Sequence, residues 1–243
     1  MHTRYPEIDL LRASAIIGMI IYHAAYDLAV FYGWNIDVFS GEWLIFQRTI
    51  ASVFLLLVGI SFAISYDRTP KEMIARKFLQ RGFLVIGCGM LVSIATYIID
   101  PMTFVRFGIL HLIGVSILLL PLFARLKWLN AAIGLLFMIV GYSLTNNTVD
   151  TFLFIPFGWL PPSFSSVDYF PLLPWFGIVL LGHTIGHYCY TQNNEWRFPF
   201  QKLEARSQQL GALTFISKNS LAIYLLHQPL IIALLWLFLG PPN

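Results

Sequence analysis

Long apolar runs recur along the whole chain of 243 residues and are separated by shorter polar stretches. A run of about 20 apolar residues crosses the roughly 30 Å hydrocarbon core of a bilayer as an α-helix. We expect seven such helices, at residues 9–31, 43–65, 82–99, 107–124, 128–145, 171–190 and 217–239. The pattern therefore predicts an all-α, polytopic transmembrane helix bundle that forms a single domain over residues 1–243.

The composition agrees with this pattern. Hydrophobic residues make up 58% of the chain and charged residues 11%, whereas soluble domains have about 45–50% and about 25%. This excludes a soluble fold and makes the lipid bilayer the first partner of the chain. The net charge is +3. Because basic residues gather on the cytoplasmic side of membrane proteins, this charge does not by itself indicate an anionic partner. We expect no nucleic acid partner.

The distribution of basic residues predicts the orientation. If the N-terminus is cytoplasmic, 13 of the 15 Lys and Arg residues lie on the cytoplasmic side: Arg4, Arg12, Arg68, Lys71, Arg76, Lys77, Arg81, Arg125, Lys127, Arg197, Lys202, Arg206 and Lys218. Positively charged residues are enriched on that side of membrane proteins. The outer side then carries a long loop from Asn146 to Phe170 that has no Lys or Arg and is rich in Pro, Phe and Ser, and we regard it as a candidate substrate loop.

Four ionisable residues of the first span, Asp9, Arg12, His23 and Asp27, share one face of the predicted helix. At about 100° per residue, the side chains of Arg12 and His23 point within about 20° of each other. Polar side chains that face lipid cost several kcal/mol, so those within a span normally line the protein interior. We expect this stripe to face the inside of the bundle.

The stripe allows a functional and a structural interpretation. His23 with a carboxylate one turn away has the arrangement of a general base oriented by an acid, but it also fits a structural hydrogen bond between helices. Asp9 and Arg12 fit ordinary interfacial anchors as well as a binding site. We favour the functional interpretation for His23 and Asp27.

Other polar residues are predicted at the outer ends of the spans, namely Arg48, Asp100, Arg106 and His111. Such a group can bind a polar substrate and move protons. The alternative is that Arg48 and Arg106 only neutralise Asp27 and Asp100, because charges embedded in a membrane need partners.

Three histidines lie in the later spans. His183 and His187 share a helix face, a spacing that can hold a metal, but no third ligand is evident, so we expect packing and no metal. His227 lies in the last span, where a hydrogen bond to a neighbouring helix is the simplest role. Pro229 just beyond it removes a backbone donor and favours a kink.

The segment RYPEIDLLRASAIIGMIIYHAAYDL resembles the start of the heparan-α-glucosaminide N-acetyltransferase catalytic-domain family, in its small bacterial branch, and more distantly the membrane sugar O-acyltransferases. The segments VFLLLVGISFAIS, FGILHLIGVSILLL, PLLPWFGIVLLGHTIG and ISKNSLAIYLLHQPL resemble successive helices of that branch. The spacing of Arg12 and His23 is also similar to that in the first helix of the O-acyltransferases. We therefore expect an integral protein of the bacterial cytoplasmic (inner) membrane.

The resemblance implies a CoA-dependent acyltransferase. It would move an acyl group, normally acetyl, from cytoplasmic acyl-CoA to a sugar amine or hydroxyl on the outer side of the membrane. In that interpretation His23 and Asp27 are catalytic and Arg12 contacts the CoA phosphates. The carbohydrate acceptor is assigned to Arg48, Asp100, Arg106 and His111, and no metal is expected. Homo-oligomer formation is left open.

The resemblance has two departures. The eukaryotic enzymes have an asparagine where this chain has His23, and their proposed catalytic histidine lies in the following luminal loop, where YGWNIDVFSGEW contains no histidine. Two other functions therefore remain open. One is a proton-coupled transporter or flippase of a polar solute, with the stripe as a proton relay. The other is a noncatalytic subunit in which the buried charges hold helices together.

Overall fold

The structure, a computed structural model, describes residues 5–144, 148–191 and 211–241. Its helices are α1 (Pro6–Tyr32), α2 (Gly41–Asp67), α3 (Lys71–Ile99), α4 (Ile109–Phe123), α5 (Leu129–Leu144), α6 (Leu172–Gly186), α8 (Gly211–Lys218) and α9 (Ser220–Leu239), with short helices η1 (Ala124–Leu126), η2 (Phe152–Phe157) and η3 (His187–Thr191). These ranges contain no β-strand and only two isolated bridges. The prediction of an all-α polytopic bundle is confirmed.

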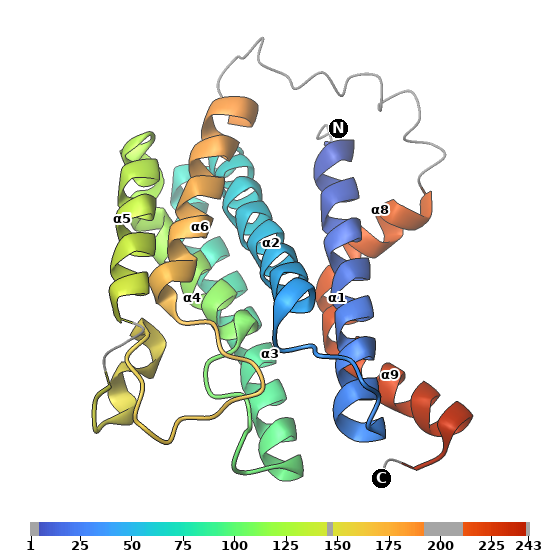
Figure 1. The fold of residues 1–243 in the computed structure, drawn as a ribbon. Coiled ribbons are helices and arrows are strands. Elements are labelled where there is room, and N and C mark those ends of the chain that lie inside the picture. The colour runs from blue at the N-terminus through green and yellow to red at the C-terminus, as the bar shows by residue number, and fades with distance from the viewer. Residues whose placement is uncertain (1–4, 145–147, 192–210, 242–243) are drawn as a thin grey trace. The chain divides into compact units, whose positions relative to one another are not determined.

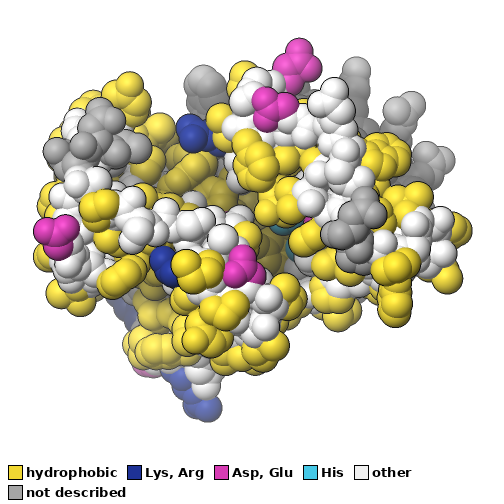
Figure 2. Space-filling view, turned by 60° about the horizontal axis from the view of Figure 1, so that its bottom comes forward, with side chains coloured by type: hydrophobic (Ala, Val, Ile, Leu, Met, Phe, Trp, Pro, Cys, Tyr) yellow, Lys and Arg dark blue, Asp and Glu magenta, His cyan; other side chains and the backbone are white. Residues whose placement is uncertain are grey.

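Each of the seven predicted spans corresponds to an apolar helix. Within the described residues six helices are long and apolar enough to cross a membrane, and α5, with 16 residues, is shorter. Large apolar side chains such as Phe83 on α3 and Phe238 on α9 are exposed. Figure 2 shows hydrophobic side chains over much of the visible face, with charged side chains in isolated places. Such surfaces suit contact with lipid.

Two helix boundaries differ from the prediction. Helix α3 begins at Lys71 rather than at residue 82, because the charged stretch before the apolar run continues the same helix. The last span is preceded by a separate helix, α8, and the chain bends at Asn219 between α8 and α9. The predicted cytoplasmic residues Arg4, Arg197, Lys202 and Arg206, and residues 145–147, lie outside the described residues.

The chain divides into two compact units, which we describe separately. The terminal unit comprises Met1–Phe54 and Phe198–Asn243, and the central unit comprises Leu55–Arg197. In the terminal unit α1 contacts both α8 and α9 (Figure 1). In the central unit α3 packs on α4 and α5 packs on α6.

Both ends of α1 follow from local sequence. Pro6 stands at the first helical position, where its missing N–H is not needed and its fixed φ suits the helix. Gly33 ends the helix with φ 67°, and the amides of Gly33 and Trp34 both donate to the Leu28 carbonyl. A left-handed residue of this kind favours glycine. The 27 residues between these signals carry Arg12, His23 and Asp27 on one uninterrupted helix.

Glycines set the helix spacing in the central unit. A Cβ at Gly182 of α6 would lie 2.2 Å from the Leu56 carbonyl oxygen of α2, and one at Gly177 would lie 2.4 Å from the Gly134 oxygen of α5. Lipid is as apolar as leucine, so helices in a membrane are held largely by close backbone packing at small residues. The backbones of α2, α5 and α6 therefore approach closely only because these positions lack side chains.

The long loop before α6 is attached to the segment between α3 and α4. The Val167 amide donates to the Thr103 carbonyl at 2.8 Å, and the Phe170 amide donates to the Phe107 carbonyl at 2.9 Å. Asp168 accepts a hydrogen bond from the Ile109 amide at 3.0 Å, and so satisfies one of the N–H groups that the first turn of a helix leaves unpaired. The described part of the predicted substrate loop, residues 148–170, is thus attached to the rest of the central unit.

We expect Gly182→Ala to destabilise the protein, because its Cβ meets backbone atoms that cannot move aside. Overpacking of this kind costs about 1–3 kcal/mol. Gly87→Ala on α3 is the matched control, since a Cβ there meets nothing within 4 Å. The melting temperatures of both variants, measured by thermal unfolding in detergent, test this expectation. An unchanged melting temperature for Gly182→Ala would contradict the close α2–α6 contact.

Asp168 makes a pH dependence testable. Burial raises the pKa of this loop carboxyl from its ordinary value to about 6, so between about pH 4 and about pH 6 the folded chain holds more protons than the unfolded chain. The contribution of Asp168 to the free energy of unfolding therefore falls as pH rises through this window. Asp168→Asn keeps an oxygen for Ile109 but cannot ionise. Melting temperatures measured across the window should decline less in Asp168→Asn, and an equal decline would assign the effect to other groups.

Candidate functional site

A buried polar cluster lies where α1 meets α9 in the terminal unit. His23 and Asp27 come from successive turns of α1, and His227 and Gln228 are adjacent on α9. The Gln228 Nε2 atom donates to Asp27 Oδ1 at 2.7 Å. The ring centroids of His23 and His227 are 4.8 Å apart, in an edge-on arrangement. The hydrogen bond and the ring contact thus both join α1 to α9, two helices that are far apart in sequence.

This polar cluster has unused hydrogen-bonding capacity. Asp27 is 0% exposed and His227 is 6% exposed. Three buried atoms, Asp27 Oδ2, His227 Nε2 and Gln228 Oε1, have no hydrogen-bond partner among the described residues. Unsatisfied buried polar atoms are costly and uncommon, and they often mark a functional site. The cluster therefore has the chemistry of a site that receives a polar ligand.

The catalytic pair predicted from sequence is assembled differently from the expectation. No hydrogen bond joins His23 to Asp27 in the part of the chain that the structure describes. The carboxylate of Asp27 is held by Gln228, and the ring of His23 contacts those of His227 and Tyr22. Asp27 is therefore oriented from α9, while His23 is positioned by ring packing.

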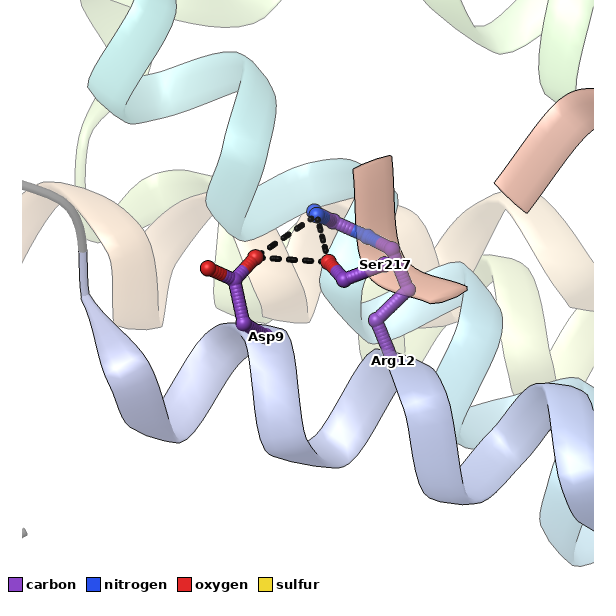
Figure 3. A network of polar contacts seen from close by, with 3 residues as sticks. All are labelled: Asp9, Arg12 and Ser217. Atoms are coloured by element: carbon purple, nitrogen blue, oxygen red, sulfur yellow. Dashed lines mark hydrogen bonds and ion pairs between the residues drawn. The ribbon is translucent and has the colours of Figure 1, made fainter. Parts of the chain in front are cut away.

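A second network joins the start of α1 to α8 (Figure 3). The Arg12 Nη1 atom donates to Ser217 Oγ at 3.0 Å and lies 3.6 Å from Asp9 Oδ1. The Ser217 hydroxyl in turn donates to Asp9 Oδ1 at 2.6 Å. The Arg12 side chain keeps 23% of its surface exposed. Asp9 and Arg12 thus connect α1 to α8, and Arg12 still reaches the surface.

The remaining predicted site residues fall in both units. Arg48 lies in the terminal unit, on the exposed side of α2, and forms no ion pair with Asp27 among the described contacts. Asp100, Arg106 and His111 belong to the central unit. The structure brings only His23 and Asp27 of the predicted outer group into one cluster within a unit.

In the central unit these residues have local partners. Asp100 accepts from the Thr103 hydroxyl at 2.5 Å and from the Met102 amide at 2.8 Å, and these bonds lower its pKa. Arg106 donates to the Met102 carbonyl and lies over the rings of Phe104, Phe152 and Phe164. No ion pair joins Asp100 and Arg106 within this described segment, so the neutralising pair considered from the sequence is not formed there.

His111 has a structural environment at the start of α4. Its Nδ1 atom accepts a hydrogen bond from the Gly108 amide at 3.3 Å, which caps the helix. The side chain is 7% exposed, and its ring lies against Phe107 and against the backbone near Gly89.

His183 and His187 stack on α6 and η3. Their ring centroids are 6.4 Å apart, and the angle between the ring planes is 2°. The Asn130 side-chain nitrogen of α5 lies 2.9 Å from His183 Nδ1 and donates to the Phe123 carbonyl. Among the described residues no group of three or more His, Cys, Asp or Glu side chains is placed to hold a metal.

Sequence reasoning missed two residues and gave a third a different partner. Gln228 and Ser217 were not singled out, although a glutamine beside a histidine inside an apolar run is a detectable signal. His227 was expected to bond to a neighbouring helix, yet its Nδ1 atom lies 2.5 Å from the Tyr224 carbonyl of its own helix. Pro229 lies inside α9, which continues past it to Leu239.

Comparisons with known proteins give one match. The family model described as the catalytic region of heparan-alpha-glucosaminide N-acetyltransferase matches residues 4–229, a range that includes all four residues of the α1–α9 cluster. No curated protein and no solved structure matched the chain in the other two comparisons.

We expect Gln228→Met to destabilise the protein, because Asp27 would lose its hydrogen bond while remaining buried. Hydrogen bonds between membrane helices contribute about 0.6–2 kcal/mol, and an unpaired buried acceptor adds to that cost. Leu226→Met, at an exposed position of the same helix, is the control and should have little effect. Equal melting temperatures for the two variants would show that the Asp27–Gln228 contact does not stabilise the fold.

Proposed function

We propose that this chain, which belongs to the heparan-α-glucosaminide N-acetyltransferase catalytic family, moves an acyl group from acyl-CoA to a sugar amine or hydroxyl. The family supports membrane acetyltransferase activity in general. We further propose the identity of the donor, the class of the acceptor and the side of the membrane on which each binds. The observation that carries it is the buried cluster of α1 and α9, which has three unpaired polar atoms within the matched range.

Acyl transfer needs a group that handles a proton or the acyl group at the thioester carbon. His23 is proposed for this role, either as a base toward the acceptor or as a transient carrier of the acyl group. Both roles create positive charge on the ring at some stage. Asp27, one turn away and held by Gln228, supplies a negative charge that stabilises it.

The donor is proposed to bind from the cytoplasmic side through its phosphates. Arg12 suits this contact because guanidinium groups bind phosphate in bidentate fashion, and its side chain is partly exposed. A phosphate there would compete with Asp9 for the same guanidinium. Arg12 and His23 lie on one face of α1, about 16 Å apart along its axis, a distance that suits an extended pantetheine arm.

The acceptor is proposed to be a carbohydrate on the outer side, with an envelope glycan, a lipid-linked sugar or a small amino sugar as the candidates. Arg48, Asp100, Arg106 and His111 remain proposed acceptor contacts. The long loop of residues 148–170 is anchored next to three of them, through Val167, Asp168 and Phe170. A loop in that place can select an acceptor without taking part in the chemistry.

The test is release of CoA from labelled acetyl-CoA by purified protein, with and without an amino sugar. We expect acceptor-dependent release, and we expect His23→Ala to lower it by at least about 100-fold, the smallest contribution typical of a positioned acid–base group. His187→Ala, on a half-buried histidine of the central unit, is the control and should stay active.

Two outcomes would contradict the proposal. Full activity in a folded His23→Ala protein would remove the role assigned to His23. Uptake of a solute driven by a pH gradient, together with no CoA release by the wild type, would instead favour a transporter.

A further inference from the structure

The hydrogen bond of His227 determines which of its ring nitrogens carries the proton. The Nδ1 atom lies 2.5 Å from the Tyr224 carbonyl oxygen, and a carbonyl can only accept a hydrogen bond. Nδ1 must therefore carry the hydrogen. In the neutral ring this leaves the lone pair on Nε2.

The Nε2 atom is buried and has no hydrogen-bond partner in the part of the chain that the structure describes. The side chain as a whole is 6% exposed. If His227 served only to stabilise α9, its Nδ1 contact would be sufficient and the opposite nitrogen could face lipid or a neighbouring donor. Instead an unprotonated nitrogen is held inside the protein with no donor to satisfy it.

The ring of His227 lies among residues of the proposed site. His23 of α1 lies against the His227 ring at 4.8 Å between centroids, and the ring of Tyr224 lies at 5.4 Å. Asp27 of α1 is bonded to Gln228, the next residue along α9. The titratable side chains in contact with the His227 ring are thus His23 and Tyr224, and Asp27 is held by the residue that follows His227.

We infer that His227 is a second catalytic histidine of this site and that its Nε2 atom removes the proton from the acceptor. The inference rests on the proposed function. The acceptor amine or hydroxyl loses its proton to Nε2 as its lone pair attacks the thioester carbonyl, forming the new C–N or C–O bond. The C–S bond breaks, and the CoA thiolate leaves and takes up the proton from the imidazolium, so that products are acylated acceptor and CoA thiol.

This assignment divides the site by helix. α1 carries Arg12, which is proposed to hold the acyl donor, and His23, which lies against the His227 ring. α9 carries His227, whose basic nitrogen faces the acceptor. The bond to Tyr224 has the same effect as the second hydrogen bond of many catalytic histidines, since it selects the tautomer and fixes the ring.

His227→Asn tests the base directly. The asparagine side-chain nitrogen can replace Nδ1–H as donor to the Tyr224 carbonyl, but the side chain has no basic nitrogen in place of Nε2. We expect a folded variant whose acyl transfer is at least about 100-fold slower. We also expect the wild-type rate to rise with pH as the base loses its proton, and this rise to be absent in the variant. His187→Asn is the matched control and should keep the wild-type rate and pH profile.

The outcomes are separable. If His227→Asn is folded and keeps the wild-type rate and pH profile, His227 is structural and the inference is wrong. Should that variant fail to fold, His227→Gln, which also lacks a basic nitrogen, takes its place with the same expectations. If the wild type itself transfers no acyl group, the proposed function fails.

The histidine tautomer is measurable without activity. Nitrogen-15 chemical shifts of the ring in the neutral wild-type protein should show Nδ1 protonated and Nε2 unprotonated. The reverse pattern would overturn the inference even in an active enzyme.

Discussion

The hydrogen bond between Gln228 and Asp27 is the constraint on which the candidate site depends. Asp27 is fully buried in an apolar helix, where an unpaired carboxylate would be very costly. The partner comes from the last helix of the chain, so α1 and α9 must meet at this register for the carboxylate to be tolerated. The same register places His227 against His23. One polar contact thus determines which side chains share the site.

The helices of the central unit are held together by close packing at glycines. In a bilayer, apolar side chains gain little by leaving lipid for protein, so association of helices relies on close packing. The central unit meets this requirement with glycines at the α2–α6, α5–α6 and α3–α4 contacts, where a single Cβ would meet backbone or neighbouring side chains at less than 3 Å. Glycine contacts thus hold the helices of the central unit together, whereas a buried polar contact joins α1 to α9 in the terminal unit.

Some polar residues of the central unit are satisfied by local contacts. Asp100 binds the turn that follows it, and His111 caps the helix in which it lies. Asp168 connects the long loop to the first turn of α4. Asp100 and His111 are predicted as acceptor contacts from the sequence because polar residues at the ends of membrane spans are uncommon. In the structure their hydrogen bonds also give Asp100, His111 and Asp168 structural roles as turn supports and helix caps.

The sequence by itself determined the helical class, the approximate spans and the shared face of Arg12, His23 and Asp27, because these depend on apolar run length and the helical repeat alone. The sequence also indicated the family, through the spacing of Arg12 and His23 and the similarity of the helical segments. Tertiary structure decided that Asp27 bonds to Gln228 rather than to His23, and that Ser217 joins Asp9 and Arg12. These partners lie about two hundred positions away along the chain, and helical periodicity specifies which way a side chain points but not which helix it meets.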